Sequence, residues 1–175
     1  MKRFLPLLVC AVACQSTPEK LPEEQVTHQT NPEFARIRPV ALAVLKTEAP
    51  EKGLRERSRT ELYKQLIEKR KYSPIRLDVV DARTDSKGVF EYSNDVAVDA
   101  TIQLKITNWR KLQGQNAYQW AADLVMTHRS GVELFRCELK RGVAKSGVDI
   151  DYSGVSNRIV SKMIEKLPER PARPE

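Results

Sequence analysis

The residue with the most distinctive chemical setting is Cys14, which follows the small residues Ala11, Val12 and Ala13. A cysteine directly after such a run resembles a lipobox, where lipoprotein-processing enzymes acylate the thiol and cut the chain just before it. We therefore predict that Cys14 is lipidated and becomes the first residue of the exported protein. Several acyl chains on one cysteine hold a protein on a bilayer far more firmly than a single chain does.

Residues 1–13 have the composition of a bacterial export signal. Lys2 and Arg3 give a positive start, and residues 4–13 are uncharged and mostly apolar. As a helix these ten residues rise only about 15 Å, too little to cross a bilayer core about 30 Å thick. We assign residues 1–13 as a signal peptide. The alternatives are ordinary cleavage after Ala13 without lipid, and an uncleaved anchor, which the short length disfavours.

The residue after Cys14 predicts where the anchored protein resides. Gln15 occupies the position at which an aspartate retains lipoproteins at the inner membrane of bacteria with two membranes. By analogy with that sorting rule, we expect the protein on the periplasmic face of the outer membrane, held there by its lipid anchor.

Few other residues are placed for catalysis or metal binding. Cys137 alternates with Phe135 and Leu139, so we interpret it as a buried core residue, with a reactive thiol as the alternative. His28 and His128 stand apart from further candidate ligands, and two candidates do not make a zinc site.

The remaining candidates for chemistry are carboxylates and known motifs. Asp149 and Asp151 are interpreted as flanking the start of a helix, with a glycosidase pair as the alternative. The sequence contains no phosphate-binding loop, GxSxG or HExxH motif. We therefore expect no cofactor, no metal and no enzymatic activity.

Length and charge limit the domain count and the class of partner. The chain has 175 residues and a formal net charge of +7, which suits one domain with a basic surface. An exported protein rarely meets nucleic acid, so we expect no nucleic-acid partner. Anionic lipid head groups or cell-wall carboxylates are the partners that a basic balance favours, and a solvated surface of mixed charge is the plainer interpretation.

The chain divides into a tether, one domain and a tail. Residues 14–36 hold the lipidated cysteine and a proline-containing polar segment with no helical or strand period, which predicts a disordered tether. Residues 37–167 contain the periodic apolar segments of a single α/β domain. Residues 168–175 are rich in proline and charge and predict a disordered tail.

The first half of the domain has the pattern of a strand, a helix and a strand. Residues 40–45 are continuously apolar, as in a central strand. Residues 52–70 predict a helix with one buried stripe. Residues 75–79 alternate as a second strand, and the long connection favours a parallel crossover. The stripe of the helix comprises Leu54, Ser58, Leu62, Tyr63, Leu66 and Ile67.

The second half has the pattern of three strands and a helix. Residues 98–107, 118–127 and 132–139 alternate between apolar and polar residues and are joined by short loops, which predicts an antiparallel meander. A change of period near Leu134 and Phe135 predicts a bulge. Residues 140–151 are expected to form a link, and the apolar stripe of residues 155–167 predicts a final helix, capped by Asp151 or by Ser153.

Together these elements predict an α+β fold, a two-layer α/β arrangement with a mixed five-stranded sheet and two helices on one face. The other face would be left open to water, because polar residues alternate with apolar ones along the meander. We take this open face as the candidate partner-binding surface. Its candidate residues are Gln103, Lys105, Thr107, Gln119 and Asp123.

The order of these segments resembles that of a group of bacterial envelope proteins. The lipobox at Cys14, the tether, RPVALAVLK, ELYKQLIEK, DATIQLKITNW and SNRIVSKMIEKL are similar in arrangement to the TolB amino-terminal domain, LpoB and CsgG. Those relatives usually have a further helix before the third strand, for which residues 81–95 leave little room. The resemblance implies a non-enzymatic binding or assembly role in the cell envelope, with a protein partner that it does not identify.

Our hypothesis from the sequence is a lipid-anchored accessory or assembly module of an envelope complex. Two alternatives remain: an enzyme that acts on cell-wall or surface polymer, and a purely structural lipoprotein that forms oligomers. The sequence leaves the oligomeric state open.

Overall fold

The structure is a computed structural model that describes residues 23–75, 98–112, 116–145 and 149–170. The predicted signal peptide, Cys14, residues 76–97 and the last five residues of the tail lie outside the described residues. The elements are β1 (Gln25–Thr30), α1 (Glu33–Ile37), β2 (Ala41–Val44), α2 (Lys52–Glu68), β3 (Ser73–Ile75), β4 (Ala100–Lys111), β5 (Ala117–His128), β6 (Glu133–Lys145) and α4 (Tyr152–Ile164).

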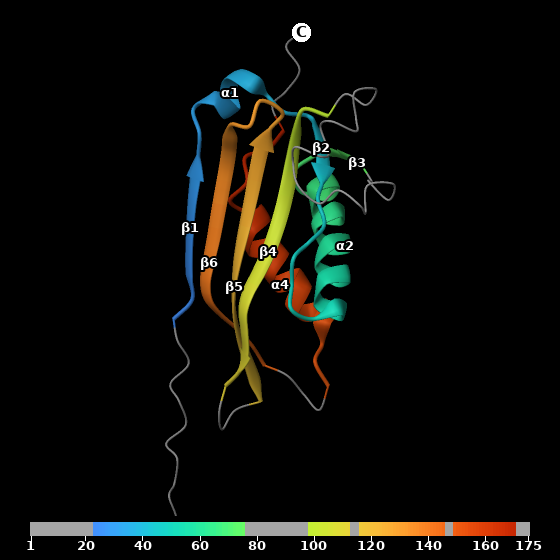
Figure 1. Cartoon of the computed structure of the whole chain (residues 1–175), viewed down its shortest axis with the longest axis vertical. Helices are drawn as coiled ribbons and strands as arrows, with labels where there is room; N and C mark the ends of the chain where they lie inside the picture. Colours follow the sequence, from blue (N-terminus) through green and yellow to red (C-terminus); the bar gives the residue numbers. More distant parts are fainter. Residues whose placement is uncertain (1–22, 76–97, 113–115, 146–148, 171–175) are drawn as a thin grey trace, which may run out of the picture.

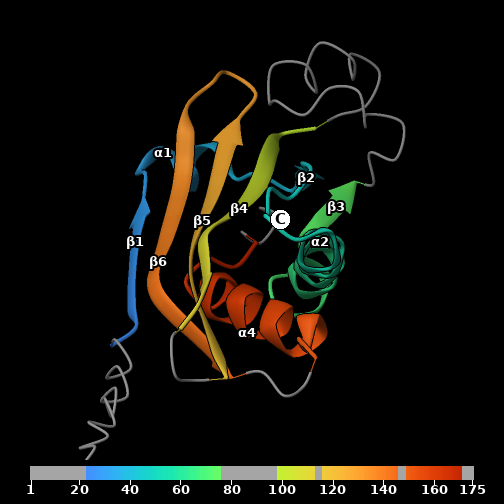
Figure 2. The same ribbon diagram turned by 60° about the horizontal axis from the view of Figure 1, so that its bottom comes forward.

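The described strands form one mixed sheet in the order β1-β6-β5-β4-β2-β3. Strand β2 pairs in parallel with β3 and with β4, whereas β4, β5 and β6 form the antiparallel meander. Helices α2 and α4 both lie on the same side of this sheet (Figures 1 and 2). The predicted α+β class, the parallel crossover and the meander are therefore confirmed.

The sheet has six strands rather than the predicted five, because part of the expected tether is ordered. Residues 25–30 form β1, which pairs antiparallel with β6, and residues 33–37 form the short helix α1. Strand β1 is mostly exposed and lacks an apolar alternation, so its residues carry no strand signal of their own. It is a strand because β6 offers it a row of unpaired backbone groups. The described fold thus begins before residue 37.

Several predicted boundaries also change. The expected link of residues 140–151 begins as strand, because β6 continues to Lys145. The expected tail starts with ordered contacts: the Tyr72 hydroxyl donates to the Pro168 carbonyl at 3.0 Å, and the Arg170 N–H donates to the Arg70 carbonyl at 3.1 Å. These bonds hold residues 168–170 against the end of α2.

Helix α2 buries a narrower stripe than the sequence predicts. Leu54, Ser58, Leu62 and Leu66 are buried, but Ile67 is 46% exposed. Each residue advances about 100° around a helix, so Ile67 is carried past the buried side that Leu66 occupies. The prediction that Ile67 belongs to the buried stripe was wrong.

Helices α2 and α4 meet along a seam that is partly polar. The Ser58 hydroxyl donates to the Ser156 hydroxyl at 3.0 Å, and the Gln65 side chain donates to Asn157 and Ser161. Helix α4 places its apolar side on the sheet and is capped as predicted, since the Asp151 carboxylate accepts from the backbone N–H groups of residues 153 and 154.

The core lies between the sheet and these two helices. Cys137 belongs to it and is fully buried, which confirms its interpretation as a core residue. Burial raises the pKa of the Cys137 thiol to about 11, so the thiol stays protonated near neutral pH.

Two bulges bend the sheet beside the middle of β5. In β4 the register shifts after Thr107, where Asn108 has a φ of 54°. In β6 the register shifts between the partners of Trp120 and Ala122, and Arg141 there has a φ of 59°. A further shift in β6 lies beside Phe135 and confirms the bulge predicted near Leu134.

The bulge in β6 places Gly142 directly against the Trp120 ring. A Cβ atom on Gly142 would overlap the ring, which is fully buried and has no room to turn aside. A side chain in this position therefore forces either the ring or the strand to move.

We predict that Gly142→Ala lowers the free energy of unfolding by about 1–3 kcal/mol, the usual cost of overpacking a core. Urea unfolding followed by tryptophan fluorescence measures it. Gly131→Asn is the comparison variant: Gly131 has open space around its Cα, so a side chain there meets no overlap and only the strain of a φ of 87°, which asparagine adopts more readily than most residues, lowers its stability. Equal stability of the Gly142→Ala variant and the unaltered protein would contradict the assigned packing.

Candidate interaction surface: the open sheet face and the edge of β1

The five residues predicted for the open face lie on the side of the sheet away from the helices. Lys105 on β4 is directly opposite Asp123 on β5, and Gln103 and Thr107 flank Lys105 on the same face. Gln119 lies beyond the bulge, where its side chain accepts two hydrogen bonds from Arg110 at 3.0 and 2.7 Å. Gln119 nevertheless lines the same hollow as Thr107 and Asp123, so the structure brings all five residues to one face.

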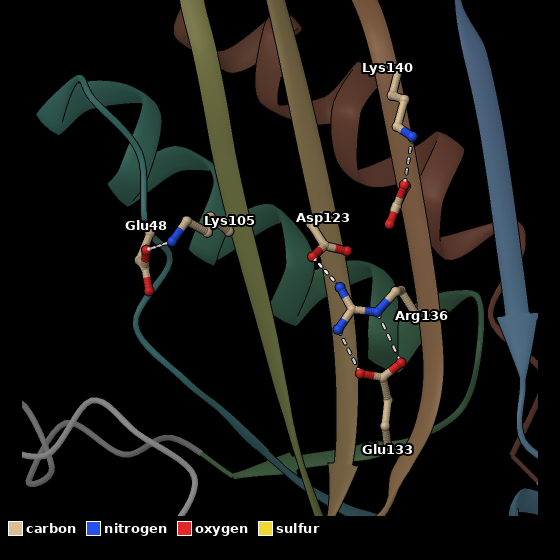
Figure 3. A network of polar contacts seen from close by, with 7 residues as sticks. Glu48, Lys105, Asp123, Glu133, Arg136 and Lys140 are labelled. Atoms are coloured by element: carbon tan, nitrogen blue, oxygen red, sulfur yellow. Dashed lines mark hydrogen bonds and ion pairs between the residues drawn. The ribbon is translucent and has the colours of Figure 1, made fainter.

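A row of charged residues crosses this face from one strand to the next. Glu48, which follows β2, is bridged to Lys105; Lys105 is opposite Asp123; and Asp123 is opposite Glu138 on β6. The charged residues of this row and its neighbours are Glu48, Lys105, Asp123, Glu133, Arg136, Glu138 and Lys140, of which Figure 3 labels all but Glu138.

Arg136 joins three of these charges. Its guanidinium donates to the Asp123 carboxylate at 2.6 Å and to both oxygens of the Glu133 carboxylate at 2.9 and 2.6 Å. Separate ion pairs connect Lys105 with Glu48 at 2.8 Å and Lys140 with Glu138 at 3.1 Å. Each of the four carboxylates is therefore paired with a cation of the same face, although Asp123 and Glu133 share Arg136.

The acidic side chains titrate unequally because their surroundings differ. Burial raises the pKa of Asp123, and the nearby Glu138 and Glu133 raise it further, while Arg136 opposes both effects. The hydrogen bonds from Arg136 lower the pKa of Glu133. The same bonds raise the pKa of Arg136, and the bond to Glu48 raises that of Lys105. Arg136 thus favours the ionised form of two carboxylates on adjacent strands and opposes their mutual repulsion.

A shallow hollow of about 390 Å³ lies where the two bulges face each other across β5. Its wall includes Asn108, Arg141, Asp123 and Glu138. One oxygen of Asp123 is closed off from solvent and accepts no hydrogen bond from the described residues. The hollow contains acidic and basic groups side by side, so its net charge is small.

The sequence analysis missed five charged members of this face: Glu48, Glu133, Arg136, Glu138 and Lys140. Arg136 and Glu138 had a usable signal, since they alternate with Phe135, Cys137 and Leu139. Glu48 had none, because it lies between the predicted strand of residues 40–45 and the predicted helix of residues 52–70. Its backbone N–H nevertheless donates to the Leu104 carbonyl at 3.0 Å.

The outer edge of β1 has unpaired backbone groups. The Asn31 N–H donates to the Leu134 carbonyl at 2.9 Å, and antiparallel pairs alternate in bonding, so the groups of residues 25, 27 and 29 point to β6. The backbone N–H and C=O groups of Val26, His28 and Thr30 therefore point away from β6, toward the outer edge of the sheet. Within the described chain no strand pairs with that edge (Figure 1).

The groups that the sequence offered for catalysis remain scattered. His28 is opposite Cys137 across the β1–β6 pair, but that thiol is buried and protonated near neutral pH. His128 binds Ser130 in the β5–β6 turn, and Asp151 caps α4. Among the described residues no group of three or more His, Cys, Asp or Glu side chains is arranged to hold a metal ion.

No helix in the described ranges is both long and apolar enough to cross a membrane.

Comparison with known proteins finds the fold but no sequence family. Two structures of PelC from Paraburkholderia phytofirmans, both dodecamers, superpose with TM-scores of 0.56 and 0.60 at 13% identity, over 85% of this chain and 100% of theirs. Lipoprotein GNA1162 from Neisseria meningitidis is 14% identical over 73% of this chain and 97% of its own, with a TM-score of 0.48. No family model and no curated protein matches the chain.

At this level of identity the PelC structures show a shared fold and nothing further. The resemblance to TolB, LpoB and CsgG stays a prediction, as do lipidation at Cys14 and the role of the open-face residues.

We predict that Arg136→Gln lowers the free energy of unfolding by about 1–2 kcal/mol at neutral pH, because it removes three charge-assisted hydrogen bonds from a half-exposed site. The loss should shrink as the pH falls. Glu133 has a lowered pKa in the folded protein, so its ionised form stabilises the fold, and this stabilisation disappears as falling pH protonates the group. Asp123 has a raised pKa in the folded protein, so its ionised form destabilises the fold, and this cost disappears as the pH falls.

Urea midpoints measured across the acidic range test this expectation. Lys105→Gln is the matched control, since Lys105 and Glu48 form an exposed pair and should contribute little. A deficit in Arg136→Gln that is constant from neutral to acidic pH would show that the carboxylates are not its source.

Proposed function

We propose that this chain is an exported, lipid-anchored envelope protein without enzymatic activity, which assembles with further copies of itself through the free edge of β1. The observation that carries the proposal is that edge: six uncharged, mostly exposed residues with the backbone groups of Val26, His28 and Thr30 directed outward. An unprotected edge of this kind is a template for pairing with another strand.

The other edge strand is built differently. Strand β3 has three residues and contains Pro74, which has no backbone N–H to offer. Strand β1 has no proline, no charged residue and no bulge against β6. The contrast between the two strands supports β1 as the pairing edge.

The open face supports an assembly role over binding of a charged ligand. Its four carboxylates and three cations are paired with one another, so little charge is left for a ligand to neutralise. A face of this kind can lie beside a neighbouring subunit without a large desolvation cost for unpaired charge.

Two further points favour assembly on a membrane. The PelC chains that share the fold are dodecamers. Acylation at Cys14 would confine copies to a plane, and confinement raises their effective concentration for one another.

We expect His28→Pro to weaken self-association by at least tenfold without unfolding the protein. Proline removes an N–H that points outward and leaves the bonds of residues 25, 27 and 29 to β6 in place. Light scattering coupled to size-exclusion chromatography of the exported chain with Cys14→Ser gives the mass over a concentration series.

Gln29→Pro is the matched control, because the N–H it removes points to β6, and it should lower the unfolding midpoint. A monomeric unaltered chain, or a His28→Pro chain that associates as strongly as the unaltered one, would count against the proposal.

For the anchor, we expect labelled palmitate to be incorporated into the unaltered chain in cells and not into Cys14→Ser, because the thiol is the acceptor. Membrane fractionation should then find the serine variant depleted from the outer membrane. Equal labelling of the two chains would mean that Cys14 is not the acylated residue.

A further inference from the structure

Charge is divided unequally between the two layers of the fold. The helical layer, residues 52–71 and 152–170, carries twelve Lys and Arg against five Glu. The remaining described residues carry eleven basic and eleven acidic side chains. The net positive charge of the described residues therefore comes from the layer that contains α2 and α4, on one side of the sheet (Figure 2).

The outward side of α2 and the turn that follows it present part of this charge. Arg57 and Lys64 on α2 are seven residues apart, or about two helical turns, and Lys71 lies three residues past the end of the helix, with a φ of 57°. All three side chains are exposed. None of them forms an ion pair with the described residues. Ile67 lies between Lys64 and Lys71 and is one of two exposed large hydrophobic side chains in the described chain. Cations around an exposed apolar side chain suit a membrane surface.

The chain also enters the fold at this layer. The Glu24 carboxylate, just before β1, pairs with Arg158 at 3.2 Å and with Lys162, both on α4. The ten residue steps from Cys14 to Glu24 span at most about 33 Å, at about 3.3 Å each. A bilayer that holds the acyl chains on Cys14 is therefore within reach of the helical layer.

We propose that the outer surface of α2 and α4 is a docking surface for a bilayer with anionic phospholipid head groups. The proposal deepens the proposed function, because it takes membrane attachment at Cys14 as given. With the helical layer on the lipid, the open sheet face points away from the membrane. The edge of β1 then points sideways, where it can meet a second copy held on the same membrane.

The experiment measures binding of the exported chain, with Cys14→Ser, to vesicles by co-sedimentation. Vesicles of phosphatidylcholine alone are compared with vesicles that also contain phosphatidylglycerol, at low and high salt. We expect binding to the anionic vesicles only, and a steep loss with salt, because exposed charges are screened.

The decisive variant is the triple substitution Arg57→Gln, Lys64→Gln and Lys71→Gln. Each cation near an anionic surface contributes about fivefold, so the partition coefficient should fall about 100-fold. The matched control removes three exposed cations from the β5–β6 hairpin, Arg129→Gln, Lys140→Gln and Arg141→Gln, and should change binding less than about threefold. Circular dichroism confirms that both variants are folded.

Absence of binding to anionic vesicles, or an equal loss in the two triple variants, would overturn the docking surface. Binding to both kinds of vesicle alike would also overturn it, since the charge would then play no part. These results do not depend on the anchor. If the unaltered chain incorporates palmitate but the Cys14→Ser chain does not bind anionic vesicles, the docking surface is rejected and the lipid anchor stands. If the Cys14→Ser chain binds anionic vesicles but the unaltered chain incorporates no palmitate, the lipid anchor is rejected and the docking surface stands.

Discussion

The fold depends on the burial of one face of a mixed sheet under two helices. Burial of apolar surface is the main source of stability, and here it is concentrated on a single face, where Trp120, Phe135, Ile159 and Met163 lie in the core. Two helices are enough to cover that face. The other face and the edge of β1 therefore have to be stable in water by other means, and these exposed parts are where interaction is possible.

The open face is stabilised by pairing charge with charge. Asp123 and Glu138 are directly opposite each other, an arrangement that destabilises a sheet unless a cation intervenes. Arg136 binds Asp123 and Glu133, and Lys140 pairs with Glu138. The two bulges beside β5 bend the sheet at the same level and bring Asn108 and Arg141 to the rim of the hollow. The result is a polar face in which every carboxylate has a cationic partner.

The layers differ in what they offer to a partner. The sheet layer has a nearly neutral open face and a free backbone edge, whereas the helical layer has an excess of cations over carboxylates. A backbone edge recognises another strand through hydrogen bonds, and a cationic surface recognises an anionic one through long-range attraction. Strand pairing takes place at the β1 edge of the sheet, and attraction to an anionic surface takes place on the helical side. One subunit can therefore use both interactions at once.

The sequence by itself determined the elements whose residues repeat with a helical or strand period. The three meander strands, the stripe and Asp151 cap of α4, the parallel crossover and the burial of Cys137 all follow from local pattern, because each segment must turn its apolar residues to one side. The same alternation placed Lys105 and Asp123 on one face. Where the pattern was short, as for Ile67 at the end of a stripe, the prediction went wrong.

Only the tertiary structure decided β1, the Arg136 network and the division of charge between layers. The residues of β1 have no apolar alternation, and they form a strand because the edge of β6 supplies hydrogen-bond partners more than 100 residues away. Arg136 meets Asp123 only once the register of β5 and β6 is set. Local sequence encodes the periodicity of an element, whereas the partner of an edge or a charge depends on which distant segments the folded chain brings together.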